Sequence, residues 1–242
     1  MFIIPMAGLS SRFFKSGYNL PKYQLTLPNN ETMFEWAVDS FKAYFETDLF
    51  LFIVRNVYDT PTFVKNMCNK LGIIDFKIVI LEGETRGQAE TVYLGLKELK
   101  NILSEEEIYI FNIDSRRLNF VKSEISYNCD GYLEVFKGEG DHWSFIEINC
   151  KNEVIRTTEK ERISELCSDG LYFFKSLHEY IQLVEIGIKE NLFCKEELYI
   201  APLYNLMIRN GKKVSYDLID EKYIEFCGTP AEFENISKKI LG

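Results

Sequence analysis

The sequence predicts an α/β fold in which helices flank a mixed, mostly parallel central sheet. Two patterns carry this prediction. Up to Asp114, short apolar runs of strand length alternate with segments of helical spacing, an order that is typical of parallel strands joined by crossover helices. Beyond Asp114, strand-like runs follow one another over short connections, which indicates mixed or antiparallel pairing in that part of the sheet.

Local signals place the elements of the first half. The run 49–54 is apolar throughout, as expected for a strand that is covered on both faces. Thr32 and Glu35 form a capping-box pattern, which predicts a helix that runs to about Tyr44. Pro61 can occupy the first turn of another helix. The remaining strands are expected at 2–4, 76–81 and 108–113, and the remaining helices at 61–71 and 89–99.

The second half is interpreted in the same way. Gly211 closes a helix over 197–209, and Thr229 with Pro230 begins the last helix, because threonine caps helices and proline fits a first turn. Strands are expected at 131–136, 144–150, 154–157, 170–174, 214–218 and 223–227, and a further helix at 177–189. The sequence contains no repeat and no linker composition, so we expect one domain over 1–242.

The composition argues against some classes of function. A net charge of −9 disfavours general binding to nucleic acid or to anionic membranes, and it means that a polyanionic substrate needs local cations and Mg²⁺. The six cysteines form no CxxC pair, so we expect reduced thiols, no zinc site and a cytoplasmic location. The apolar run Met1–Met6 is too short for a signal peptide or a membrane span.

The turn after the first strand has the features of an anion-binding loop. Gly8, Ser10 and Ser11 let backbone amides approach an anion closely, because they carry no bulky side chain. Arg12 offers a fixed fork of donors that suits phosphate oxygens, and Lys22 offers a compact cation. A turn at the carboxyl end of a first parallel strand is where α/β proteins bind nucleotides. The alternative is a plain surface turn that carries an arginine.

This stretch resembles the signature of the nucleotidyltransferases that activate sugar phosphates and related phosphorylated alcohols, A-G-G-x-G-[ST]-R followed by P-K. Leu9 and Ser10 stand where that signature has glycines. The resemblance implies a Rossmann-like nucleotidyltransferase fold and catalytic roles for Arg12, on the leaving phosphates, and Lys22, between the α-phosphate and the incoming phosphate. It implies nucleotide contacts for Met6, Ala7, Gly8, Leu9, Ser10, Ser11, Arg12 and Lys22.

A second motif follows the strand expected at 76–81. In the resembled family the matching turn contacts the base and the ribose, which implies nucleotide contacts for Glu82, Gly87, Gln88, Ala89 and Thr91. The run 86–96 is also similar to the R-x-x-S-V-x-x-G-L stretch of cytidylyltransferases, which implies CTP. An ordinary junction between a strand and a helix is the alternative.

Two carboxylates are candidate Mg²⁺ ligands. Asp114 directly follows an apolar strand, where a carboxylate is costly unless it faces a cation or solvent, and an aspartate at this place binds Mg²⁺ in the resembled family. The run 223–233 is similar to the family's closing W-x-D-x-G-T-P-E-D-L, whose aspartate is a second ligand; strict alignment puts Phe226 there, with Glu225 one place earlier. Either Glu225 is the second ligand, or one protein carboxylate acts together with waters, which Mg²⁺ tolerates.

The acceptor is expected to meet Glu159 and Lys160. These residues lie in a block that resembles the family's V-x-x-x-x-E-K-P segment, and a solvated charge cluster over 159–162 is the alternative. Arg116 is a further candidate for a pocket of mixed charge.

The motifs run from Phe2 to Phe233 in the family's order, which implies an enzyme that joins a phosphorylated acceptor to a nucleoside monophosphate and releases pyrophosphate. The loop 6–23 and the short length are most similar to cytidylyltransferases that use L-glutamine phosphate in capsule phosphoramidate biosynthesis, so CTP and L-glutamine phosphate are the expected substrates. The sequence leaves open whether the chain forms a homodimer. The alternatives are a sugar-1-phosphate or phosphocholine nucleotidyltransferase, a glycosyltransferase of related fold, which Asn112 disfavours, and a non-catalytic nucleotide-binding regulator.

Overall fold

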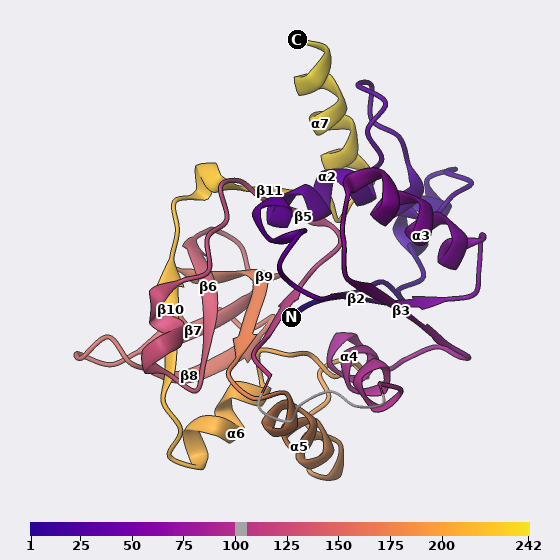
Figure 1. Cartoon of the computed structure of the whole chain (residues 1–242). Coiled ribbons are helices and arrows are strands. Elements are labelled where there is room, and N and C mark those ends of the chain that lie inside the picture. The colour runs from indigo at the N-terminus through magenta and orange to yellow at the C-terminus, as the bar shows by residue number, and fades with distance from the viewer. Residues whose placement is uncertain (100–105) are drawn as a thin grey trace. The chain divides into compact units, whose positions relative to one another are not determined.

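The computed structural model describes residues 1–99 and 106–242 (Figure 1). The chain divides into two compact units. The first unit comprises Met1–Ile3, Thr85–Phe111 and Val121–Glu221, and the second comprises Ile4–Glu84, Asn112–Phe120 and Lys222–Gly242. Strand β1 (Phe2–Pro5) therefore begins in the first unit and ends in the second. The single domain expected over 1–242 stays a prediction.

The first unit contains a mixed sheet and the helices that pack on it. Its strands are β4 (Ile108–Phe111), β6 (Gly131–Lys137), β7 (Ser144–Ile148), β8 (Val154–Glu159), β9 (Leu166–Phe174) and β10 (Val214–Leu218). β4 pairs in parallel with the start of β1 and antiparallel with β9. β9 pairs antiparallel with β6, and β6 pairs in parallel with β10. β7 joins β9 and forms an antiparallel hairpin with β8, so the mixed or antiparallel pairing expected beyond Asp114 is confirmed.

The helices of this unit are α4 (Gln88–Lys97), η3 (Glu124–Asn128), α5 (Leu177–Lys189) and α6 (Leu203–Arg209). The short helix η4 (Glu221–Tyr223) begins at the last residue of the first unit and continues in the second. α5 contacts both α4 and α6. It begins where predicted because the Ser176 hydroxyl accepts a hydrogen bond from the Glu179 amide. The helix predicted over 197–209 begins only at Leu203, so the first part of that prediction is wrong: Pro202 holds the N-cap and Cys194 forms a bridge with Glu197.

The second unit contains parallel strands and short helices. Its elements are α1 (Ser11–Lys15), η1 (Lys22–Gln24), α2 (Met33–Val38), η2 (Asp39–Tyr44), β2 (Phe50–Arg55), α3 (Thr60–Leu71), β3 (Phe76–Leu81), β5 (Ser115–Arg117), β11 (Ile224–Phe226) and α7 (Pro230–Leu241). β2 and β3 pair in parallel over their whole length, and β5 pairs antiparallel with β11. β2 is buried from Phe50 to Val54, which confirms the prediction from its continuous apolar run. The structure thus confirms an α/β fold with a mixed, largely parallel central sheet flanked by helices.

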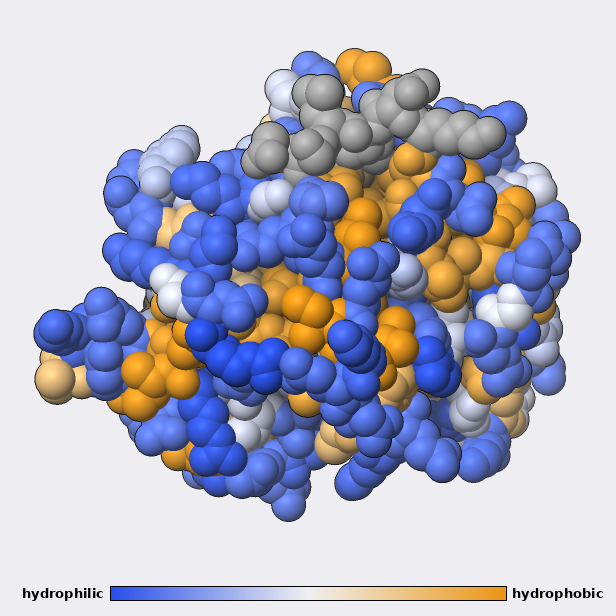
Figure 2. Space-filling view, turned by 90° about the horizontal axis from the view of Figure 1, so that it is seen from below, coloured by the Kyte–Doolittle hydropathy of each residue, from blue (hydrophilic) through white to orange (hydrophobic). Residues whose placement is uncertain are grey.

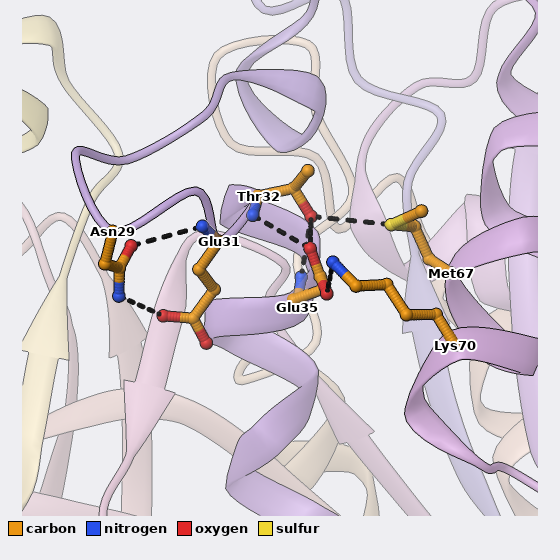
Figure 3. Close-up of polar contacts among 6 residues, drawn as sticks. All are labelled: Asn29, Glu31, Thr32, Glu35, Met67 and Lys70. Atoms are coloured by element: carbon orange, nitrogen blue, oxygen red, sulfur yellow. Dashed lines mark hydrogen bonds and ion pairs between the residues drawn. The ribbon is translucent and has the colours of Figure 1, made fainter.

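The capping box predicted at Thr32 is confirmed and extends to a neighbouring helix (Figure 3). The Thr32 hydroxyl accepts from the Glu35 amide at 3.2 Å, and the Thr32 amide donates to the Glu35 carboxylate at 3.0 Å. The Lys70 ammonium of α3 lies 2.6 Å from the same carboxylate. The helix changes to 3₁₀ geometry from Asp39, with a kink at Phe41, although it ends at Tyr44 as predicted.

One face of the molecule carries mostly polar side chains with smaller apolar groups between them. Figure 2 shows this alternation of hydrophilic and hydrophobic residues on one face of the molecule. Within the described ranges 1–99 and 106–242, every helix is too short or too polar to cross a bilayer.

Candidate active site

The loop that follows β1 is fixed at its start and open at its middle. The Met6 amide donates to the Ile53 carbonyl of β2 at 2.7 Å, and the side chains of Met6 and Ala7 are buried. Gly8 and Leu9 are exposed, and a Cβ placed on Gly8 would have no described atom within 4 Å. The backbone at Gly8 is therefore exposed, and no side chain covers the place where its Cβ would be.

Ser10 connects this loop to Lys22. Ser10 caps α1 in the left-handed conformation, with φ of 51°, and its carbonyl accepts from the amides of Phe13 and Phe14. Its hydroxyl accepts from the Lys22 amide at 3.2 Å. Glycine has no side chain that could accept this hydrogen bond from the Lys22 amide, which is a physical reason for serine at this position. Arg12, on the first turn of α1, is exposed.

Lys22 and Asp114 lie 92 residues apart and form an ion pair, with 2.5 Å between the lysine Nζ and the aspartate Oδ2. Both side chains are partly exposed, at 21% and 27%. The Asp114 carbonyl accepts from the Cys227 amide at 2.7 Å, which fixes the aspartate against the end of β11. A Cβ on Gly228 would lie only 3.3 Å from Asp114 Oδ2, so the glycine leaves room at the carboxylate.

The residues present fit Mg²⁺ if one protein carboxylate binds it together with waters and phosphate oxygens. Within the described part of the chain, no three His, Cys, Asp or Glu side chains gather as they would in a cage made by protein alone. The partly exposed carboxylate of Asp114 is the hard oxygen ligand that Mg²⁺ prefers, and Mg²⁺ commonly keeps waters and phosphate oxygens as its other ligands. The donor set therefore suits Mg²⁺ that arrives with phosphates.

The other residues predicted near this site have charged partners. The Glu225 carboxylate forms an ion pair with Lys239 of α7, and Glu225 stands opposite Arg116 in the β5–β11 pair. The Arg116 guanidinium lies 3.0 Å from the Asp39 carboxylate. Glu225 as a second metal ligand and Arg116 as an acceptor contact stay predictions.

Gly87, in the first unit, is required by packing at the start of α4. Its φ is +109°, and a Cβ there would lie 2.6 Å from the Leu198 carbonyl oxygen. The Leu198 backbone is bound on both sides, since its amide donates to the Arg86 carbonyl at 2.6 Å and its carbonyl accepts from the Ala89 amide at 3.0 Å. The glycine motif therefore serves the fold of this unit, a function that the sequence pattern does not reveal.

The side chains that follow Gly87 mostly point into the first unit. Ala89 and Thr91 are buried, and the Thr91 hydroxyl contacts the Thr85 hydroxyl at 2.6 Å and the Gly87 carbonyl at 3.0 Å. Burial raises the pKa of Glu90, but hydrogen bonds from Arg86 outweigh it, so the net pKa lies below the usual value. Gln88 is half-buried, and Glu82 of the second unit is exposed. Contacts of these residues with a base stay predictions.

Glu159 and Lys160 form a structured cluster at the end of β8. The Glu159 side chain is only 7% exposed and accepts from the Ser144 hydroxyl at 2.5 Å, so the alternative of a solvated charge cluster is wrong for this residue. Burial raises the pKa of Glu159, although Ser144 and Lys160 act against this. The Lys160 ammonium lies 3.9 Å from the Glu159 carboxylate and hydrogen-bonds the Tyr199 hydroxyl.

Sequence reasoning did not find Ser144, Tyr199 and Gly228. Ser144 and Tyr199 belong to segments far from Lys160 in the sequence and have no motif spacing that marks them. Gly228 stands in the G-T-P run that resembles the family's closing motif, so a signal for it was present.

Comparisons with solved structures find both close and distant similarities. No protein-family model matches the chain, and no curated protein sequence matches it. A nucleoside-diphosphate-sugar pyrophosphorylase from Vibrio cholerae RC9 is 48% identical, with a TM-score of 0.94 over 98% of this chain and 100% of the other. An inositol-1-phosphate CTP transferase from T. maritima is 16% identical, with a TM-score of 0.73 over 98% and 94%. A UDP-glucose pyrophosphorylase bound to UDP-glucose is 12% identical, with a TM-score of 0.74 over 99% and 97%.

Proposed function

Because the chain belongs to the nucleotidyltransferase family, we propose that it transfers the cytidylyl group of CTP to a small phosphorylated acceptor and releases pyrophosphate. The observation that carries this proposal is the ion pair of Lys22 with Asp114, since it joins a cation and a carboxylate from distant segments. The hydrogen bond from the Lys22 amide to Ser10 ties that pair to the open loop at Gly8. The cytidylyltransferase-like run 86–96 supports CTP as the nucleotide.

The reaction needs positioned positive charge more than covalent chemistry. An oxygen of the acceptor phosphate attacks the α-phosphorus of CTP and forms a new P–O–P linkage. The bond from the α-phosphorus to the bridging oxygen breaks, and pyrophosphate leaves with that electron pair. Lys22 would bind the α-phosphate and the attacking phosphate, and Arg12 with the loop amides would bind the leaving phosphates.

Asp114 is the residue that would hold Mg²⁺. When bound, this ion supplies neutralisation of the phosphate charge. Lys22 has two functions in this proposal, because it neutralises the Asp114 carboxylate in the free protein and the phosphates in the complex.

We propose L-glutamine phosphate as the acceptor, as part of capsular polysaccharide modification. An amino-acid acceptor carries both an ammonium and a carboxylate, so it suits the mixed charge of Glu159 and Lys160. A sugar 1-phosphate is the second candidate, because the protein that is 48% identical is called a nucleoside-diphosphate-sugar pyrophosphorylase.

A pyrophosphate-release assay tests the proposal. The purified chain is incubated with Mg²⁺, each of the four nucleoside triphosphates, and L-glutamine phosphate, phosphocholine or hexose 1-phosphates. Release that needs both CTP and L-glutamine phosphate supports the proposal, and release with a sugar 1-phosphate selects the second candidate. Tight CTP binding without release under any condition would identify a nucleotide-binding regulator and contradict both.

A further inference from the structure

Tyr199 contacts Lys160, the residue proposed to meet the acceptor, in two ways. The Lys160 ammonium hydrogen-bonds the Tyr199 hydroxyl, and it lies 4.3 Å from the centre of the Tyr199 ring. A cation at this distance from an aromatic face is attracted by the ring as well as by the hydroxyl. The Glu159 carboxylate, 3.9 Å away, is a third neighbour of the same ammonium. A lysine side chain with four flexible carbons is thus held by three groups.

The backbone at Lys160 also directs this side chain. The Lys160 backbone adopts the left-handed conformation, with φ of 55°, which costs energy for a residue other than glycine. Its amide donates to the Trp143 carbonyl at 2.9 Å, across the hairpin of β7 and β8. Strain of this kind persists only where the surroundings hold the residue, and the hydrogen bond to the Trp143 carbonyl does so here.

The chemistry of the phenol suits this role. A neutral phenol can accept a hydrogen bond from an ammonium and donate one to a carboxylate. Burial first, and then the hydrogen bond and charge of Glu197 and the charge of Glu159, raise the pKa of Tyr199 well above its usual value. The shift favours the neutral phenol further, and its hydroxyl can bridge Lys160 and Glu197.

The segment that carries Tyr199 is itself fixed. Leu198, the preceding residue, makes the two backbone hydrogen bonds to Arg86 and Ala89 and fills the space beside Gly87. The position of the Tyr199 ring therefore depends on the turn at the start of α4. One short segment of the first unit thus contacts both the turn predicted to meet the base and the lysine predicted to meet the acceptor.

We propose that Tyr199 is a positioning residue that aims the Lys160 ammonium at the acceptor. This inference rests on the proposed function, in which Lys160 meets the acceptor. Tyr199 would act through Lys160, so its loss should affect the acceptor and leave CTP binding nearly unchanged.

Steady-state kinetics of two variants test this inference. Tyr199→Phe keeps the ring and removes the hydroxyl, so the KM of the acceptor should rise about fivefold, as expected for one hydrogen bond. Tyr199→Leu removes both contacts, so this KM should rise by about 20-fold or more. The KM of CTP should stay within about twofold of the wild-type value in both variants. An unchanged acceptor KM in Tyr199→Phe and Tyr199→Leu, or an equal rise of both KM values, would overturn the inference.

Tyr93 provides a matched control in the same unit. Its hydroxyl donates to the Glu185 carboxylate at 3.1 Å, and the Lys97 ammonium lies 5.6 Å from its ring centre. It thus has the same types of partner as Tyr199 but is not in contact with Lys160. Tyr93→Phe should leave both KM values as in the wild type, and a rise of the acceptor KM in this variant would contradict a specific role for Tyr199.

A measurement that does not depend on turnover separates this inference from the proposed function. Reductive methylation of the folded chain, followed by mass spectrometry, gives the modification rate of Lys160. The rate should increase in Tyr199→Leu and stay unchanged in Tyr93→Phe, with circular dichroism to check the fold. A wild-type chain that turns over no substrate refutes the proposed function, and with it the acceptor role of Lys160. An unchanged Lys160 rate in an active enzyme refutes the role of Tyr199 alone.

Discussion

Replacing Lys22 by alanine should separate catalysis from stability. The Lys22–Asp114 pair has 2.5 Å between its charged atoms, but both side chains are more than one-fifth exposed, so solvent screens it. Its loss should lower the free energy of unfolding by about 1 kcal/mol or less. Loss of a cation that binds charge in the transition state should slow turnover roughly 10²–10³-fold, by analogy with single oxyanion donors. The catalytic loss should therefore greatly exceed the loss of stability.

Two measurements on Lys22→Ala check this difference: the kcat for pyrophosphate release and urea unfolding. Lys137→Ala is the control, because Lys137 also pairs with a carboxylate, that of Glu165, and both side chains are exposed. The control should unfold and turn over like the wild type. If Lys22→Ala keeps kcat within about threefold of the wild type, Lys22 is not a catalytic residue and the proposed site is wrong.

Three further predictions concern the surroundings of the site and the fold. Gly228→Ala puts a Cβ 3.3 Å from the Asp114 carboxylate, so Mn²⁺ binding in the presence of CTP, measured by electron paramagnetic resonance, should weaken; unchanged binding would contradict it. Gly87→Ala forces a Cβ against the Leu198 backbone at φ +109°, so urea unfolding should show a loss of about 2 kcal/mol or more. Burial raises the pKa of Glu35. The hydrogen bonds from Lys70 and Thr32 lower it by more than burial raises it, so the net pKa lies below 4.5. The stability from this shift is present above pH 4.5 and is lost as the pH falls through the folded-state pKa, and urea unfolding should show a smaller acid loss in Glu35→Gln.

Elements with strong local signals could be predicted from the sequence. The strands at 76–81 and 214–218 and the helix at 177–189 occur with the predicted bounds. β5 was not predicted, because its three residues have no detectable period and its strand geometry depends on pairing with β11. The residues before α6 have helical spacing, but the hydrogen bonds of Leu198 to Arg86 and Ala89 hold them in another conformation.

For the candidate site, the sequence indicated which charges should meet but not what holds them. Asp114 and Lys22 were expected to meet around phosphates, and the structure pairs them with each other; their roles stay proposals. The contacts of Tyr199 with Lys160 and of Ser144 with Glu159 could not be predicted. They depend on β7 and on the segment before α6 reaching the end of β8, which is a property of tertiary packing.

The loss of two glycines from the first loop was the reason to consider a non-catalytic regulator. The structure weakens that reason. Leu9 is 49% exposed, so its side chain lies in solvent and leaves the loop open. Ser10 adopts the left-handed conformation that glycine would adopt, and its hydroxyl accepts from the Lys22 amide. Gly8 keeps an exposed backbone, and the contact from Ser10 fixes Lys22 beside it, as an active enzyme would need.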